Sequence, residues 1–265
     1  MMLIRRTLFG AALGLLALGA GMAAAETAEQ RGLRLATEAS NRNGGYEDIT
    51  VSGEMILKTS GGQSATRRFD ARWVTTGAGA SRSMLIFRWP GDIRNTALLT
   101  HVFTGKKDDQ WLYLPAMERV RRISGSGRSG SFVGSEFAFE DMADQEVDKF
   151  KHQWIAEQNC PGGGRCHVID RFPTSKSGYS RQRIWLDTAQ LRLQQVHYFD
   201  RRGAHLKTLS VSGYRQYNGR FWRSSRMDMV NHLTGARTRL NWKGYTFNQG
   251  LQKNAFTVNA LRRIR

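Results

Sequence analysis

The sequence predicts an α+β fold that is mainly β, with a curled antiparallel sheet and helices covering its concave face. Short segments of alternating apolar and polar residues recur at intervals of roughly 10–15 residues. The turns between them use Gly, Asn and Asp, as in Asn218-Gly219 and Thr234-Gly235, which is typical of antiparallel hairpins rather than of parallel β-α-β units. A sheet of about ten such strands must curl or close to protect its edges.

An amphipathic helix is expected first, over residues 26–43 (ETAEQRGLRLATEASNRN), and Gly44-Gly45 ends it. A second, short helix is expected at FEDMADQEVDKF (139–150). The expected strands are, in order, EDITVSGEMIL, RRFDARWV, SMLIFRWP, NTALLTHVFT, DDQWLYLPAM, SRQRIWLD, LRLQQVHYFD, HLKTLSVSGYRQY, RFWRSSRMDMV and RTRLNWKGYTF.

Residues 1–25 have the features of a cleaved secretory signal peptide, and residues 26–265 are expected to form a single domain. Arg5 and Arg6 precede an apolar run that ends in AAA, which offers a cleavage site before Glu26. The arginine pair leaves both the general secretory route and the twin-arginine route open. Because no cysteine lies near the cleavage site, we expect an exported, soluble protein without a lipid anchor.

The charge of the chain is strongly positive and limits its partners. The formal net charge is +18, and removal of Arg5 and Arg6 leaves 38 basic residues against 22 acidic ones, a net of +16. On an exported protein this charge fits an anionic membrane surface or an acidic partner better than nucleic acid. A solvated basic surface is the alternative, and the two can hold together.

The two cysteines, Cys160 and Cys166, enclose the short loop CPGGGRC. Because disulfides form in oxidising compartments, export predicts a disulfide between them, and closing so small a ring stabilises the fold by about 2–3 kcal/mol. The pair lacks the two-residue spacing of redox motifs. A metal site with His167 would lack a fourth ligand nearby.

The segment GSGRSG (125–130) matches the glycine spacing of a dinucleotide-binding loop, but its surroundings do not. That fingerprint requires a buried strand before the glycines and a helix after them, whereas the charged RVRRI precedes them and SFVGSEFAF follows. A flexible Gly/Ser segment followed by Phe132, Phe137 and Phe139 instead suggests a mobile flap over a hydrophobic opening. The alternative is an ordinary connection that these phenylalanines pin to the core.

Three stretches resemble a known family. DDQWLYLPAMERVRRISGSGRSGSFVGSEFAFEDM (108–142) and the preceding FRWPGDIRNTALLTH (87–101) resemble the outer membrane lipoprotein-sorting proteins, the LolA-like and LolB-like periplasmic carriers, and FTVNALRR (256–263) is similar to the same family. The match is close over residues 80–142. It is looser over residues 180–265, where strand order and composition carry it.

The resemblance implies a LolA/LolB-like incomplete barrel with helices plugging its concave side and lipid chains between helices and sheet. It implies a periplasmic carrier that moves a lipid or lipoprotein between membranes, toward the outer membrane. Some relatives stand near inner-membrane transporters of the resistance-nodulation-division class, which makes such a transporter a candidate partner. The alternative function is an envelope scaffold or transporter accessory protein that carries no cargo.

Apolar side chains of the predicted strands are the candidates for contact with acyl chains. The chain holds 13 Phe, 7 Trp and 9 Met, which together provide a large and adaptable apolar surface. Each candidate can equally be an ordinary core residue. The candidates are Phe69, Trp73, Leu85, Phe87, Trp89, Trp111 and Tyr113.

Enzyme chemistry is not indicated by the sequence. The six histidines show neither His-x-His nor His-Glu-x-x-His spacing, and the chain has no Gly-x-Ser-x-Gly motif. We therefore expect no catalytic residues, no metal and no cofactor.

The positive charge makes a prediction for membrane binding. The purified protein should bind vesicles that contain an anionic phospholipid, and the bound fraction should fall as salt rises, because salt screens the attraction between exposed charges. Co-sedimentation with vesicles at low and high ionic strength measures this. Equal binding to neutral vesicles at every salt concentration would point to apolar insertion instead.

Overall fold

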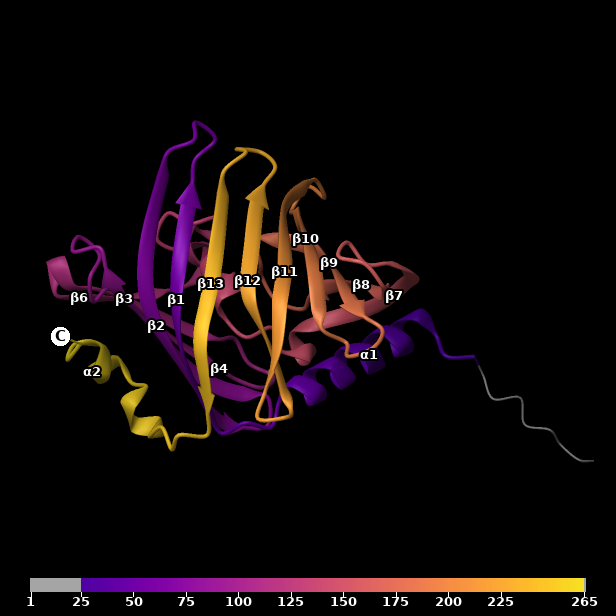
Figure 1. The fold of residues 1–265 in the computed structure, drawn as a ribbon, viewed down its shortest axis with the longest axis horizontal. Helices are drawn as coiled ribbons and strands as arrows, with labels where there is room; N and C mark the ends of the chain where they lie inside the picture. Colours follow the sequence, from indigo (N-terminus) through magenta and orange to yellow (C-terminus); the bar gives the residue numbers. More distant parts are fainter. Residues whose placement is uncertain (1–24, 265) are drawn as a thin grey trace, which may run out of the picture.

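The computed structural model describes residues 25–264, which form one antiparallel sheet of 13 strands with two α-helices (Figure 1). The strand order is β6-β5-β4-β3-β2-β1-β13-β12-β11-β10-β9-β8-β7, so consecutive strands pair as hairpins and β1 pairs with β13. Because β6 and β7 are the two edges, the sheet curls but stays open, as predicted for an incomplete barrel. Of the predicted signal peptide, residues 1–25, all but Ala25 lies outside the described residues.

None of the helices within residues 25–264 combines the length and the apolar character that a bilayer span requires. The helices and strands are α1 (Ala28–Asn43), β1 (Asp48–Lys58), β2 (Ser64–Gly77), β3 (Ala80–Trp89), β4 (Ala97–Val102), β5 (Asp109–Leu114), β6 (Arg119–Ile123), β7 (Phe150–Asn159), β8 (Arg165–Pro173), β9 (Tyr179–Asp187), β10 (Leu193–Asp200), β11 (His205–Tyr217), β12 (Phe221–Asn231), β13 (Arg237–Phe247) and α2 (Val258–Leu261). Short 3-10 helices are η1 (Pro115–Met117), η2 (Gly125–Ser129), η3 (Phe139–Met142), η4 (Val147–Lys149) and η5 (Lys253–Ala255).

Helix α1 begins at a capping box and lies against the edge strand β7. Thr27 Oγ1 accepts a hydrogen bond from the Gln30 backbone N–H (3.2 Å), and Gln30 Oε1 accepts one from the Thr27 N–H (2.9 Å). A Cβ at Gly32 would lie 2.8 Å from the backbone nitrogen of Trp154, so glycine is what lets the helix approach this closely. Leu35 then enters the main core. The first predicted helix is present, and it covers the β7 side of the sheet.

The sheet has an inner, concave face and an outer face, and other parts of the chain cover both. On β3, Leu85 and Phe87 point into the main core on the inner face, while Met84 and Ile86, in the opposite phase, pack in a second cluster. This second cluster contains residues of the C-terminal segment 251–264, including α2, which contacts β4. Of the two α-helices, only α1 therefore fits the prediction that helices cover the concave face.

The stretch between β6 and η4 folds back onto the inner face, and we call residues 124–142 the inner segment. A backbone hydrogen bond from the Phe132 N–H to the Phe137 carbonyl (2.7 Å) closes a tight turn within it. The Phe132 ring stacks on Phe87 with centroids 5.8 Å apart. Phe132, Phe137 and Phe139 are 0%, 3% and 8% exposed. The residues of the predicted flap are thus packed as core, which was the alternative to a mobile cover.

A buried ion pair holds the inner segment against the sheet. Lys207 Nζ lies 2.6 Å from Asp141 Oδ2, and the two side chains are only 5% and 4% exposed. The Tyr179 hydroxyl donates to the same carboxylate at 3.0 Å, and Gln110 Nε2 donates to the Phe139 carbonyl at 2.7 Å. Buried charges are tolerated when they are paired and hydrogen bonded, so these contacts define one position for the segment.

The stretch 139–150 forms η3 and η4 rather than the predicted α-helix. Asp141 caps η3 by accepting a hydrogen bond from the Ala138 N–H (2.7 Å) while it also pairs with Lys207. Ala143 is then extended, with φ −96° and ψ 152°, and this breaks the helical path. Tertiary contacts override the local helical pattern here.

The two edges of the sheet are protected differently. At the β7 edge, α1 packs on the strand, and the predicted disulfide between Cys160 and Cys166 is present at the turn into β8. At the other edge, β6 exposes Arg119, Arg121 and Arg122.

Loss of the buried charge pair is expected to destabilise the fold. Lys207→Met leaves the Asp141 carboxylate buried without a cation, and breaking a buried pair in this way costs about 3–5 kcal/mol. The exposed pair of Arg34 and Glu26 provides the control, because Arg34→Met should leave the free energy of unfolding nearly unchanged. Urea unfolding of both variants measures the difference. Equally small losses would show that the ion pair does not hold the inner segment.

Candidate functional site

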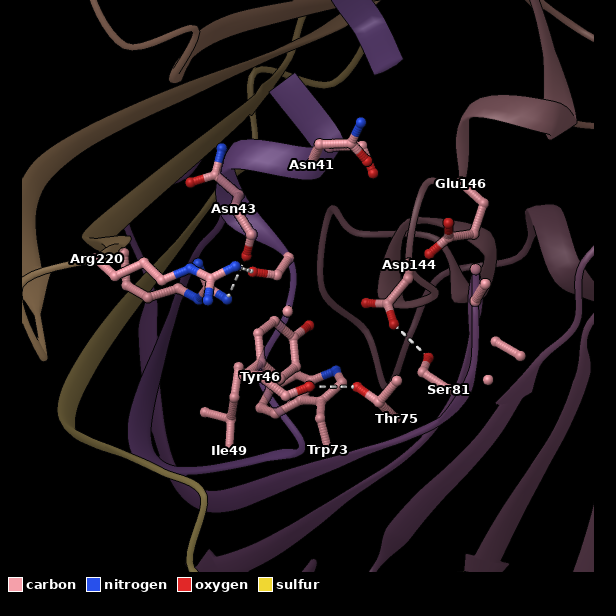
Figure 2. A pocket seen from close by; sticks show the side chains of 18 of the residues that line it. Asn41, Asn43, Tyr46, Ile49, Trp73, Thr75, Ser81, Asp144, Glu146 and Arg220 are labelled. Atoms are coloured by element: carbon pink, nitrogen blue, oxygen red, sulfur yellow. Dashed lines mark hydrogen bonds between the residues drawn. The ribbon is translucent and has the colours of Figure 1, made fainter. Parts of the chain in front are cut away.

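A cavity of about 750 Å³ opens on the inner face of the sheet (Figure 2). Its walls come from the last turn of α1 and the residues after it, from β1, β2 and the turn into β3, from residues 144–146, and from β12 and β13. Figure 2 shows apolar side chains at its base, arginine on one side and carboxylates on the other. Because β1 pairs with β13, the first and the last strand of the chain lie side by side at this site.

Aromatic side chains from neighbouring strands form the apolar wall. The rings of Trp73 on β2 and Trp242 on β13 have centroids 6.1 Å apart, and Tyr245 lies 6.4 Å from Trp242. Ile49 of β1 is the cross-strand partner of Trp73, and Met227 of β12 completes the wall. This wall is wide and contains few groups that hydrogen bond, which suits an apolar ligand.

Two arginines at the start of β12 line one side of the cavity. Arg223 donates to the Asn43 carbonyl (3.2 Å), and its guanidinium lies over the Tyr46 ring at 5.1 Å. Arg220 donates a long hydrogen bond to the Gly44 carbonyl (3.5 Å). Within residues 25–264, neither arginine has a carboxylate within 4.0 Å.

Asp144 and Glu146 line the opposite side, between η3 and η4. The Ser81 hydroxyl donates to Asp144 Oδ2 at 2.5 Å. Burial is the main cause that raises the pKa of Asp144, with a contribution from Asp108, although the bond from Ser81 opposes it. Burial and then the Asp144 charge raise the pKa of Glu146. Among the described residues, neither carboxyl has a basic partner within 4.0 Å.

Tyr46 lies between these two sides. Its backbone carbonyl accepts a hydrogen bond from Thr75 Oγ1 (2.8 Å), and its ring meets Phe221 edge-on at 6.0 Å. Burial raises the pKa of Tyr46 to about 12, with a further increase from Asp144 and a decrease from Arg223. The hydroxyl is therefore neutral at physiological pH and lies within the field of both charged sides.

A second cavity of about 300 Å³ adjoins the first one beneath α1. The two share Ser40, Asn43, Arg223 and Met227 in their walls. Arg171 also lines the second cavity, and burial lowers its pKa to about 10. The two adjoining cavities together therefore offer a ligand more space on the inner face than the first cavity alone.

Solved structures share this fold over most of its length. The structure of a domain from Vibrio parahaemolyticus, described as an outer membrane lipoprotein-sorting protein, is 40% identical to this chain, covers 89% of it and 100% of its own chain, and superposes with a TM-score of 0.86. The chain belongs to the outer membrane lipoprotein-sorting protein family. A family model described as "Uncharacterized protein" also matches residues 79–263.

Two further structures share the fold. A DUF1329 family protein from Desulfovibrio piger is 27% identical, with coverage of 89% of this chain and 99% of its own and a TM-score of 0.84. A LolA superfamily protein from Nitrosomonas europaea is 17% identical, with coverage of 86% and 97% and a TM-score of 0.68, and shows the common fold. A search of curated proteins found no match.

Four of the seven predicted lipid-contact residues of this family member lie at or behind the cavity wall. Trp73 lines the cavity directly. Phe69, Leu85 and Phe87 are 1%, 6% and 0% exposed in the main core, and the Phe69 ring meets Trp242 at 5.1 Å. These three support the wall from behind, and their contact with lipid stays a prediction. The phenylalanines of the inner segment are not among the residues that line the cavity.

The other three predicted residues lie elsewhere. Trp89 is 46% exposed at the end of β3. Trp111 and Tyr113 pack on the outer face with Phe256, in the second cluster. The prediction that they share a face with Phe69 was wrong, because on β5 it is the intervening Leu112 that packs against the main core.

The sequence pattern did not predict the β13 wall or the charged sides of the site. Trp242 and Tyr245 are three residues apart, so strict alternation would place them on opposite faces. Gly244 has φ +71°, and the pairing register with β1 shifts at this point, which brings both rings to the cavity. Gly244 between two aromatic residues was the only sign of this in the sequence.

The raised pKa of Asp144 predicts a specific pH dependence of stability. The folded state holds this proton to a higher pH than the unfolded state, so the stability of the native protein falls as pH rises above the usual range of an aspartate. Asp144→Asn should therefore raise the melting temperature at about pH 8 and leave it unchanged at about pH 3, where both states are protonated. The exposed Asp92→Asn serves as control. A constant difference across pH would contradict this interpretation.

Proposed function

We propose that this protein is a periplasmic carrier that binds the acyl chains of a lipid or lipoprotein in the inner-face cavity and moves them between membranes, toward the outer membrane. The observation that carries the proposal is the aromatic-walled cavity inside an open sheet, in a member of the outer membrane lipoprotein-sorting protein family. Export of residues 26–265 as one domain, which the sequence predicts, accords with this role.

The size of the cavity suits a lipid chain. Its volume of about 750 Å³ falls in the range of small-molecule sites, about 300–1,000 Å³. Each methylene removed from water gains about 0.8 kcal/mol, so about ten methylenes gain about 8 kcal/mol. That corresponds to a Kd of about 1 µM before the costs of ordering the chain. Such affinity is enough to carry a lipid through water and still allows release.

In this proposal the residues of the site have different roles. Trp73, Trp242 and Met227 contact the acyl chain, and Phe69 and Phe87 hold the tryptophan wall in place from behind. A transporter of the resistance-nodulation-division class and an anionic membrane surface remain the proposed partners for loading and delivery.

Filling the cavity should abolish lipid binding without unfolding the protein. Met227→Trp places a larger side chain between the two cavities, and Met117→Trp, at a site that is 71% exposed, is the matched control. Lipid extracted from protein purified from its own periplasm should be present for the native chain and the control and depleted for Met227→Trp. Melting temperatures verify that both variants are folded.

The same experiment separates the carrier from the alternative function. A folded native protein that holds no lipid, and takes up none from vesicles, would favour an envelope scaffold without cargo. Equal lipid in the native chain and in Met227→Trp would place the lipid somewhere other than this cavity.

A further inference from the structure

Four charged side chains face the same cavity without an opposite charge in contact. Arg220 lies on one side, and Asp144 and Glu146 lie on the other (Figure 2). Arg223 also lines the cavity, where it donates to the Asn43 carbonyl. Within residues 25–264, none of the four takes part in an ion pair within 4.0 Å. Arg223, Asp144 and Glu146 are half-buried, whereas Arg220 is exposed. Charged groups in partly buried sites are normally paired, so a ligand with both signs of charge would provide partners for the three half-buried groups.

The arginine side has unused hydrogen-bond donors that face the cavity. Arg223 donates to the carbonyls of Trp222 and Asn43, and Arg220 to that of Gly44. Each guanidinium carries five N–H donors, so several remain without a hydrogen bond to these acceptors. The planar fork of N–H groups matches the oxygens of a phosphate. This side of the cavity therefore suits a phosphate group.

Asp144 and Glu146 lie in the same cavity as the two arginines but form no ion pair with them. Burial raises the pKa of Asp144, and Ser81 and Lys149 oppose this rise. Arg223 opposes it least and forms no salt bridge with Asp144. Tyr46, whose pKa responds to Asp144, Glu146 and Arg223, lies between the two sides. The opposite charges thus face one another across a space that a small dipolar group can occupy.

A third polar group of the cavity also lacks a partner. Trp242 is 8% exposed, and its Nε1 is buried without a hydrogen-bond acceptor among the described residues. Buried N–H groups without acceptors are uncommon. An ester carbonyl, at the junction between an acyl chain and a head group, would provide one beside the apolar wall.

We propose that the cargo is a phospholipid with a zwitterionic, amine-bearing head group. Its phosphate is bound by Arg220 and Arg223, its ammonium faces Asp144 and Glu146, and its chains lie along Trp73 and Trp242. The inference rests on the proposed carrier function and specifies its cargo. An anionic head group without the amine would leave the two carboxyls facing negative charge, and a lipid without phosphate would leave the arginines unpaired.

The test compares three lipids with identical dioleoyl chains. Phosphatidylethanolamine, phosphatidylglycerol and dioleoylglycerol are offered separately in neutral carrier vesicles, and the lipid bound to the full exported protein is measured by native mass spectrometry. Phosphatidylethanolamine should be bound at least about tenfold more tightly than the other two, the change expected from charge-assisted hydrogen bonds. This comparison uses the native chain, so it does not depend on the folding of any variant.

Two double variants then assign the head group to its residues. Arg220→Gln with Arg223→Gln should lower phosphatidylethanolamine binding to the level of dioleoylglycerol. Asp144→Asn with Glu146→Gln should abolish the preference for phosphatidylethanolamine over phosphatidylglycerol. Arg237→Gln, at an exposed position of β13, should change neither. Melting curves establish that each variant is folded.

Each outcome bears on a different claim. Equal binding of all three lipids, or unchanged preference in both double variants, overturns the head-group assignment and leaves the carrier proposal standing. Failure of every lipid, including dioleoylglycerol, overturns the carrier proposal as well. Inorganic phosphate at millimolar concentration should not displace phosphatidylethanolamine; if phosphate alone binds at the arginines and the lipid does not, the site is for a free anion and the inference is wrong.

Discussion

The ion pair between Asp141 and Lys207 determines where the middle of the chain lies, and the site depends on it. An open sheet of this width has a concave face too large for one short helix to cover. The inner segment fills much of it by burying three phenylalanines, among them Phe132, whose ring stacks on Phe87. The buried charge pair, with the hydroxyl of Tyr179, supplies the fixed point. Asp144 and Glu146 follow directly along the chain, so their position is a consequence of that anchor.

The cavity is the part of the concave face that the two coverings leave open. Helix α1 covers the β7 side, where Gly32 lets it approach the strand, and the inner segment covers the region over β2 and β3. Between them the aromatic side chains of β2 and β13 remain uncovered on one face. Helix α1 and the inner segment bound the cavity on its two flanks, and the wall between them contains adaptable side chains such as Met227.

Local patterns in the sequence predicted most of the strands, the first helix and the disulfide, because each depends on neighbouring residues. Strands β7 and β8, on either side of the disulfide loop, were not among the predicted strands. The face on which a given side chain lies was harder to predict. Trp111 and Tyr113 were assigned to the cavity as the apolar face of a predicted strand, but the inner face of β5 carries Gln110 and Leu112. Gln110 is buried there because it donates to the carbonyl of Phe139, a residue distant in sequence. Likewise, the bulge at Gly244 depends on the pairing of β13 with β1, which period-two alternation does not reveal.

The arginines of β6 affect whether two copies of the molecule can pair through their edge strands. An uncovered edge strand presents free backbone donors and acceptors, and a second molecule could extend the sheet by adding its own edge. Arg119, Arg121 and Arg122 stand on that strand, and among the described residues only Arg122 has a carboxylate partner, Asp109. Two such edges brought together would place like charges opposite one another, which disfavours their pairing. The incomplete barrel can therefore remain open and still resist polymerising through its own uncovered edge.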